Sequence, residues 1–164
     1  MLFFICRSIL LFAFLLSSLG VAEAQGQKPN FSGTWILNLK KSALQISPPS
    51  SATFVIQHHD PHFHLTRTHV FNGKSDTWSI DILTDGKQEV VEQISDEYTS
   101  RTRMYWEGNS LVLDMTISDK SGGKATNLVK YSLADNGKTF IALEHFKAPK
   151  DEHLNKWVFD KKSP

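Results

Sequence analysis

From residue 31 onward, apolar and polar side chains alternate in short runs. Between residues 77 and 83, for example, Trp78, Ile80 and Ile82 occupy every second position. Side chains two residues apart on a strand point to the same face, so this rhythm is typical of a strand with one buried face. Because apolar residues do not recur at helical spacing over any long stretch, the sequence predicts an all-β fold.

Turn signals separate these runs at regular intervals. Asparagine-glycine and aspartate-glycine pairs favour tight hairpins, so neighbouring strands are predicted to pair antiparallel, roughly nine or ten in all. Closing such a meander removes its exposed edges, and the fold class predicted is therefore an up-and-down β-barrel, with a β-sandwich as the alternative. The turn pairs are Asn72-Gly73, Asp85-Gly86 and Asn136-Gly137.

The first 24 residues resemble a cleavable signal peptide. Arg7 precedes a continuously apolar run at residues 9–16, and Ala22-Glu23-Ala24 is a small-residue cleavage site. The apolar run is shorter than the about 20 residues that a membrane span requires. We expect a secreted or periplasmic protein whose residues 25–164 form a single monomeric domain, without stable membrane insertion after cleavage.

Composition excludes several classes of function. The single cysteine, Cys6, lies in the predicted signal peptide, so disulfides and thiol catalysis are not expected in residues 25–164. The formal net charge is +1, and basic and acidic residues are mixed along the chain, so nucleic-acid binding is not expected.

The first predicted strand carries a family resemblance. The segment Phe31-Ser32-Gly33-Thr34-Trp35 resembles the opening of a lipocalin-like barrel of the calycin superfamily, as found in small secreted bacterial domains of uncharacterised function. In that superfamily the Gly-x-Trp motif plugs the closed end of the barrel, which implies structural roles for Gly33 and Trp35. The superfamily also packs a late arginine on this tryptophan, and here no arginine follows residue 103.

Apolar side chains on the buried faces are candidates to fill the barrel or to line a ligand cavity. Inward-facing residues fill small barrels completely, whereas slightly larger barrels hold one ligand. The candidates, of which Trp78, Ile80, Met104 and Trp106 are the predicted ligand contacts, are Leu37, Ile56, Trp78, Ile80, Ile82, Met104, Trp106, Leu113 and Met115.

Two arginines offer a possible anchor for a polar head group. Arg101, Arg103 and Tyr105 share one strand face, and their spacing resembles the arginine-x-tyrosine pair with which fatty-acid-binding barrels hold a carboxylate. A guanidinium pairs with a carboxylate through two parallel hydrogen bonds. The alternative is that Met104 and Trp106 point inward, which places the arginines in water.

Histidines cluster around one predicted turn. His62 and His64 share a strand face, and with His58 they are candidate ligands for zinc or copper, which imidazole suits. Asp60 is the only carboxylate nearby. The alternative is a solvent-exposed strand face that is rich in histidine.

The function predicted is therefore non-covalent binding of a small lipid-like or aromatic molecule, apolar or amphipathic, with no catalytic role and no cofactor. No nucleophile elbow, phosphate loop or dinucleotide fingerprint is present in the sequence. A structural or interaction module with a filled barrel is one alternative. A histidine-rich metal-binding protein or metal-dependent enzyme is the other.

Overall fold

A computed structural model describes residues 28–163, which form one antiparallel sheet. The predicted signal peptide, residues 1–24, lies outside the described residues. Within residues 28–163 no helix is both long and apolar enough to cross a bilayer. The elements are β1 (Gly33–Leu37), β2 (Ser51–His59), β3 (His62–Phe71), β4 (Lys74–Leu83), β5 (Val90–Gln93), β6 (Tyr98–Glu107), β7 (Ser110–Asp119), β8 (Lys124–Ala134), the 3-10 turn η1 (Asp135–Gly137), β9 (Thr139–Ala148) and β10 (Asp151–Lys161).

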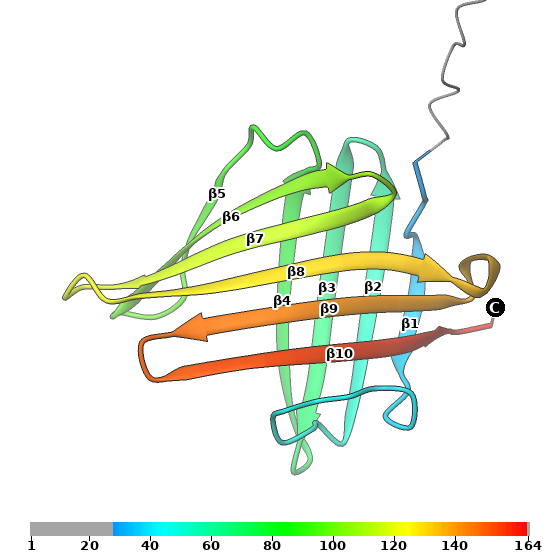
Figure 1. Ribbon diagram of the computed structural model, residues 1–164, viewed down its shortest axis with the longest axis horizontal. Helices are drawn as coiled ribbons and strands as arrows, with labels where there is room; N and C mark the ends of the chain where they lie inside the picture. The colour runs from blue at the N-terminus through cyan, green and yellow to red at the C-terminus, as the bar shows by residue number, and fades with distance from the viewer. Residues whose placement is uncertain (1–27, 164) are drawn as a thin grey trace, which may run out of the picture.

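The ten strands form a nearly closed barrel. Their order in the sheet is β4-β3-β2-β1-β10-β9-β8-β7-β6-β5, and every neighbouring pair is antiparallel. The half that contains β2, β3 and β4 crosses behind the half that contains β8, β9 and β10, and the sheet curls from one to the other (Figure 1). The predicted all-β up-and-down barrel is confirmed, and because the sheet is continuous the alternative β-sandwich is not formed.

The barrel wall has a seam between β4 and β5, which are not paired with each other. The turn at Asp85-Gly86 does not close the hairpin that its sequence predicts. Asp85 instead forms an isolated bridge with Tyr105 of β6, so the chain crosses to β6 before the short β5 begins. A side-chain hydrogen bond spans the seam farther along, where Trp78 Nε1 donates to Glu92 Oε2 at 3.1 Å.

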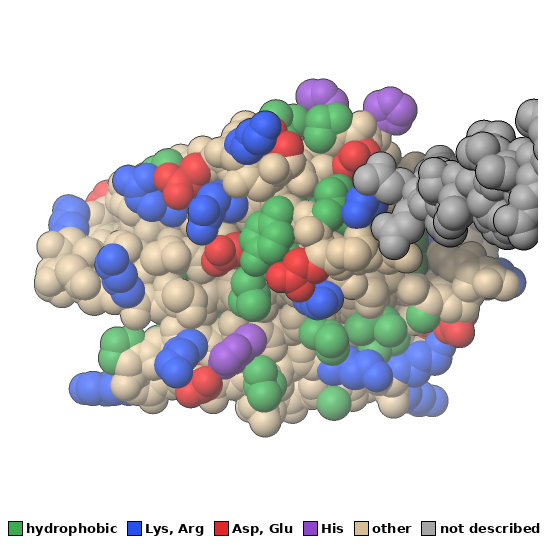
Figure 2. Space-filling model, turned by 45° about the horizontal axis from the view of Figure 1, so that its top comes forward, with side chains coloured by type: hydrophobic (Ala, Val, Ile, Leu, Met, Phe, Trp, Pro, Cys, Tyr) green, Lys and Arg blue, Asp and Glu red, His purple; other side chains and the backbone are tan. Residues whose placement is uncertain are grey.

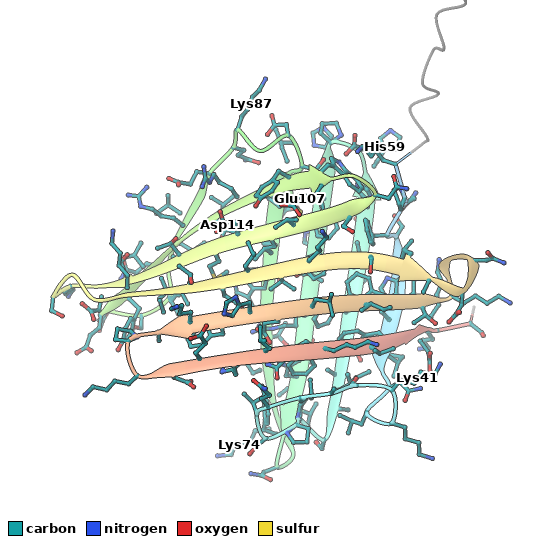
Figure 3. The ribbon with its side chains drawn as sticks, viewed as in Figure 1. Lys41, His59, Lys74, Lys87, Glu107 and Asp114 are labelled. Atoms are coloured by element: carbon teal, nitrogen blue, oxygen red, sulfur yellow. The ribbon has the colours of Figure 1, made fainter. Side chains whose placement is uncertain are left out.

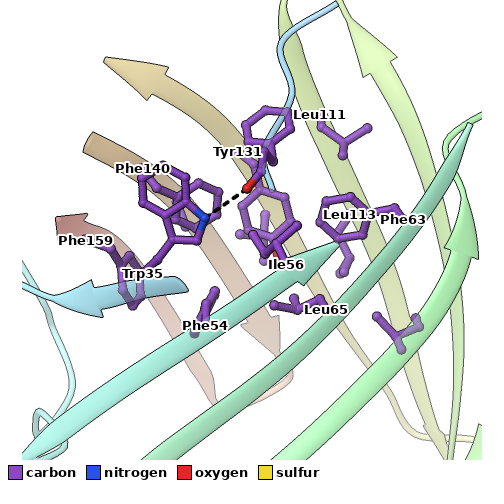
Figure 4. Packing of buried hydrophobic residues seen from close by; sticks show 14 of the residues in the cluster. Trp35, Phe54, Ile56, Phe63, Leu65, Leu111, Leu113, Tyr131, Phe140 and Phe159 are labelled. Atoms are coloured by element: carbon purple, nitrogen blue, oxygen red, sulfur yellow. Dashed lines mark hydrogen bonds between the residues drawn. The ribbon is translucent and has the colours of Figure 1, made fainter. Parts of the chain in front are cut away.

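One end of the barrel, here called the plug end, is filled by aromatic rings. Phe31 and Trp35 are both fully buried, and the Trp35 indole N–H donates to the Phe31 carbonyl at 2.9 Å (Figure 4). Lys161 Nζ lies 5.1 Å from the Trp35 ring centroid, so a lysine of β10 makes a cation–π contact with the plug. At Gly33, with φ +148°, an added Cβ would lie 2.8 Å from Lys161 Cε.

The opposite end is partly covered by the loop of residues 38–50. Leu44 and Ile46 pack against the core cluster. The loop is fastened to β10 by Gln45, whose N–H donates to Asn155 Oδ1 at 2.8 Å and whose Oε1 accepts from the Leu154 N–H at 2.7 Å. β10 therefore contacts both ends of the barrel, through Lys161 at the plug end and through Asn155 and Leu154 at the other.

Candidate ligand-binding cavity

A cavity of about 270 Å³ lies in the half of the barrel away from the plug end. Most of its wall is apolar or aromatic, and five polar side chains enter it. The lining residues are Phe54, Leu65, Arg67, His69, Trp78, Ile94, Ser100, Leu113, Met115, Ile117, Asn127, Val129, Tyr131, Ala142, Glu144 and Trp157.

Strand alternation explains how these side chains reach the cavity. On β3 the inward positions are Phe63, Leu65, Arg67 and His69, of which Phe63 packs in the filled half and the other three line the cavity. On β3, polar residues therefore enter the interior only in the half away from the plug end. The inward side chains of β3 are apolar at the start of the strand and polar at its end, and the cavity lies at the polar end.

Glu144 is held in the cavity wall by three donors. Its Oε1 accepts a hydrogen bond from Asn127 Nδ2 at 3.1 Å. Its Oε2 accepts from Asn155 Nδ2 at 2.9 Å and from Trp157 Nε1 at 2.8 Å. These donors stabilise the carboxylate in place, as hydrogen bonds to a charged acceptor are roughly twice as strong as neutral ones.

Arg67 is the only cation among the lining residues. Its guanidinium lies 5.5 Å from the Trp78 ring centroid, and its NH2 group donates to Asp76 Oδ2 at 3.3 Å. The side chain is about one-third exposed (33%), so the guanidinium reaches the mouth of the cavity while its stem remains inside.

His69 is stacked between two aromatic rings. Its ring lies 6.1 Å from Phe54 at 27° and 5.6 Å from Trp157 at 14°. Burial, together with the positive charge of Arg67, lowers the pKa of His69 to about 4. The imidazole is therefore neutral at neutral pH.

Four polar atoms in the cavity wall have no hydrogen-bond partner within residues 28–163. They are Arg67 Nε, His69 Nε2, Ser100 Oγ and Asn127 Oδ1. Each such atom costs about 1–3 kcal/mol when it is buried unpaired.

The four apolar residues that were predicted to contact a ligand lie in different parts of the barrel. Trp78 lines the cavity, whereas Ile80 and Met104 are buried in the filled part of the core. Trp106 lies beside the plug, with its ring 6.0 Å from that of Phe31 and its Nε1 donating to Asp60 Oδ1 at 2.9 Å. Of these four residues, only Trp78 is placed to touch a molecule in the cavity.

The predicted arginine anchor faces outward, which corrects the expectation for Arg101, Arg103 and Tyr105. Arg101 pairs with Glu89 at 2.7 Å, and Arg103 pairs with Asp114 at 3.4 Å on the outer surface. Met104 takes the inner position, so alternation forces its neighbours out. Figure 2 shows such basic and acidic side chains interspersed on one face, and Figure 3 labels Asp114 on β7.

The predicted metal site is not assembled, which corrects the expectation for His58, His62 and His64. His58 is buried on the inner face, where its Nδ1 accepts from the Phe31 N–H at 3.3 Å. His62 and His64 lie on the outer face of β3, and His64 Nδ1 is 2.7 Å from Asp81 Oδ1. No group of three potential metal ligands occurs in the part of the chain that the structure describes.

Sequence reasoning missed the polar residues that do line the cavity. Alternation carried a usable signal, because Arg67 and His69 stand at every second position after Phe63 and Leu65 and therefore share their face of β3. Glu144 likewise lies on the same face of β9 as apolar residues at every second position. The pattern to look for is a charged residue at a position where the other residues on the same strand face are apolar.

Comparison with known proteins supports the fold. No family model and no curated protein matches this chain. A solved structure of a mutant of the "REP1-NXSQ fatty acid transporter" is similar at 16% identity and a TM-score of 0.50, over 80% of this chain and 97% of that one. Lipid binding protein 8 of Caenorhabditis elegans is similar at 14% identity and a TM-score of 0.53, over 80% and 95% of the respective chains.

Proposed function

We propose that this protein binds one small, largely apolar molecule non-covalently in the cavity. The observation that carries the proposal is an interior of about 270 Å³ with an apolar and aromatic wall into which a few polar atoms converge. Small-molecule sites have this composition, and their volumes are about 300–1,000 Å³. The cavity is slightly smaller than that range, which favours a compact ligand with one short chain or ring system.

The two similar structures add support of a limited kind. They are described as a fatty acid transporter and a lipid binding protein, and they share the barrel with this chain at low identity. The proposal therefore takes from them only a general class of lipid-like ligand. The chemistry of the ligand has to follow from the residues of this cavity.

Tryptophan fluorescence tests the proposal directly, because Trp78 and Trp157 line the cavity. We expect the neutral dye N-phenyl-1-naphthylamine to bind with one-to-one saturation, to quench tryptophan emission and to gain emission itself. Native mass spectrometry of tag-free protein then identifies any retained small molecule by its mass. A linear dye signal that never saturates would show that the interior admits no ligand.

We also propose that the protein is exported. The support is the leader sequence, with its apolar run at residues 9–16 and Ala22-Glu23-Ala24 as the cleavage site. Intact-mass analysis of protein recovered from outside the cytoplasm is expected to give a chain that begins at Gln25. Recovery of the full chain from the cytoplasm alone would refute export.

A further inference from the structure

The part of the cavity wall that reaches solvent lies beside the seam between β4 and β5. Ile94, which directly follows β5, is the most exposed of the lining residues, at 53%. Arg67, whose side chain is one-third exposed, lies on β3 opposite Trp78 of β4. The mouth of the cavity is therefore flanked by β4 on one side and by β5 on the other.

The other boundaries of the cavity are closed. The plug end is filled by the buried rings of Phe31 and Trp35. At the opposite end the loop of residues 38–50 packs Leu44 and Ile46 against the core, and none of the loop residues lines the cavity. Around the wall, every sequential pair of strands other than β4 and β5 is joined by main-chain pairing. The seam is thus the boundary that neither a ladder nor a packed plug closes completely.

Only the half of the seam away from the plug end can open without disturbing the core. Nearer the plug end, Ile80 and Ile82 of β4 are buried in the same cluster as Met104 of β6. Farther from the plug end, β4 and β5 diverge from the segment that connects them (Figure 1). Trp78 lies two positions before Ile80 on the same face of β4, so it stands where the packed part of the seam ends.

The Trp78 side chain spans this half of the seam. Its ring lines the cavity, and its Nε1 donates across the seam to Glu92 Oε2 at 3.1 Å. The Arg67 guanidinium lies 5.5 Å from the ring centroid and is itself paired with Asp76 at 3.3 Å. Among residues 28–163 no other hydrogen bond joins β4 to β5. One side-chain hydrogen bond therefore holds the indole across the mouth.

We propose that the ligand enters and leaves the cavity through this half of the seam, and that Trp78 is a gate that Glu92 holds closed. The proposal rests on the proposed function, because a gate has a role only if the cavity takes a ligand. Opening breaks the Trp78–Glu92 hydrogen bond and turns the indole aside, while the paired strands on either side of the seam stay intact. Local openings of this kind cost less than global unfolding, so they occur within the folded state.

The rates of ligand exchange test the gate. Glu92 does not line the cavity, so removal of its carboxylate populates the open state without removing a contact to a bound molecule. In stopped-flow fluorescence with N-phenyl-1-naphthylamine, we expect Glu92→Ala to raise the association and dissociation rate constants by the same factor, about tenfold, while the dissociation constant changes by less than about twofold.

Two results for Glu92→Ala would overturn the proposal. Unchanged rate constants would show that the ligand takes another route. A rise in the dissociation rate constant alone, with weaker binding, would show that Glu92 supports the bound state and does not control a gate.

A conservative variant and a matched control assign the effect to the hydrogen bond. Glu92→Gln retains an acceptor for the Trp78 indole and should keep both rate constants within about threefold of those of the unchanged protein. Glu89→Ala removes a nearby carboxylate that pairs with Arg101 at 2.7 Å on the outer surface, and it should change neither rate constant. If Glu92→Gln were as fast as Glu92→Ala, or if Glu89→Ala accelerated exchange equally, the hydrogen bond would not be the latch.

The competing route, beneath the loop of residues 38–50, is tested with Gln45→Ala. The Gln45 Oε1 accepts from the Leu154 N–H at 2.7 Å, so the substitution loosens the loop on β10 and leaves the seam unchanged. We expect the same rate constants as in the unchanged protein. Faster exchange in Gln45→Ala, with unchanged exchange in Glu92→Ala, would place the route at the loop.

Hydrogen exchange of the unchanged protein is a test that needs no variant to fold. The amides of β5 that pair with β6 should exchange at least about tenfold faster than those in the middle of β3, because β5 moves when the gate opens. Equal exchange rates in the two strands would overturn the gate.

The dye measurements also separate the two proposals. If the dye does not saturate the unchanged protein, the proposed function fails and the gate fails with it. If the dye saturates and its rate constants do not respond to Glu92→Ala, ligand binding stands and the gate is wrong. Thermal unfolding establishes that each variant is folded before its rates are measured.

Discussion

The carboxylate of Asp60 accepts a hydrogen bond from the indole N–H of Trp106 at 2.9 Å, although the two residues are 46 positions apart. The same Asp60 oxygen accepts from Thr84 Oγ1 at 2.5 Å. Asp60 lies in the turn between β2 and β3, Thr84 directly follows β4, and Trp106 lies on β6. One carboxylate thus connects both sides of the seam at the plug end.

Asp60→Ala is expected to lower the free energy of unfolding by about 1–3 kcal/mol, because it removes both hydrogen bonds and leaves the Thr84 hydroxyl buried without a partner. Urea unfolding followed by circular dichroism measures the change. Asp96→Ala, at an exposed turn, is the control and should stay within about 0.5 kcal/mol of the unchanged protein. Equal effects of the two substitutions would show that Asp60 does not fasten the seam.

Trp35→Phe is expected to cost about 2–4 kcal/mol of unfolding free energy. The substitution leaves the buried Phe31 carbonyl without its donor, creates a void in the plug and replaces the indole over which Lys161 lies by a smaller ring. Thermal and urea unfolding check this expectation. Because Trp35 does not line the cavity, dye affinity of the folded variant should be unchanged, and a selective loss of binding would contradict the assignment of Trp35 to the plug.

Ala142→Leu is expected to weaken dye binding at least tenfold without loss of the fold. Ala142 is buried in the cavity wall, so the larger side chain occupies space that a ligand needs. Fluorescence titration gives the affinity, and circular dichroism confirms that the barrel is retained. Unchanged dye affinity in a folded Ala142→Leu protein would place the bound dye outside the cavity.

Stability is expected to decrease as pH falls from 6.5 towards 4. Burial lowers the pKa of His69 to about 4, from 6.5, and lowers the pKa of His58 as well. Because the folded protein favours the neutral imidazoles, their contribution is complete above pH 6.5 and is lost as acid protonates the unfolded chain first. Arg67, Asp76 and Glu144 are the charged groups that act on His69.

Urea unfolding over this pH range measures the dependence. The variant His69→Gln, which cannot take up a proton there, is expected to show a smaller loss of stability between neutral pH and pH 4. Identical pH profiles for the unchanged protein and the variant would contradict the role assigned to His69.

The alternation of side chains predicted the strands because burial of one face leaves a direct trace in the sequence. The alternation at residues 77–83 predicts a strand, and these residues lie in β4. The turn at Asp85-Gly86 shows where local pattern fails, since its residues pair with β6 and not across the expected hairpin. The strand that pairs with the residues after a turn depends on how the barrel closes, and no local sequence signal encodes this.

The candidate site was less accessible to sequence reasoning. The arginine-x-tyrosine spacing at Arg103 and Tyr105 drew attention to a face that points to solvent, while Arg67 and Glu144 were overlooked. Spacing identifies which residues share a face, but whether that face is inner or outer depends on its apolar neighbours. Convergence of residues from strands far apart in the chain is a property of the closed barrel alone.

The seam between β4 and β5 has a dynamic consequence. Elsewhere adjacent strands are joined by continuous main-chain ladders. This seam is spanned by the Trp78–Glu92 hydrogen bond at 3.1 Å and, at the plug end, by the Asp85 bridge and the hydrogen bonds of Asp60. Separating β4 from β5 breaks few hydrogen bonds, so the free energy of opening there is far lower than that of global unfolding. For the ligand that we propose, the seam is the part of the barrel wall whose opening breaks the fewest main-chain hydrogen bonds.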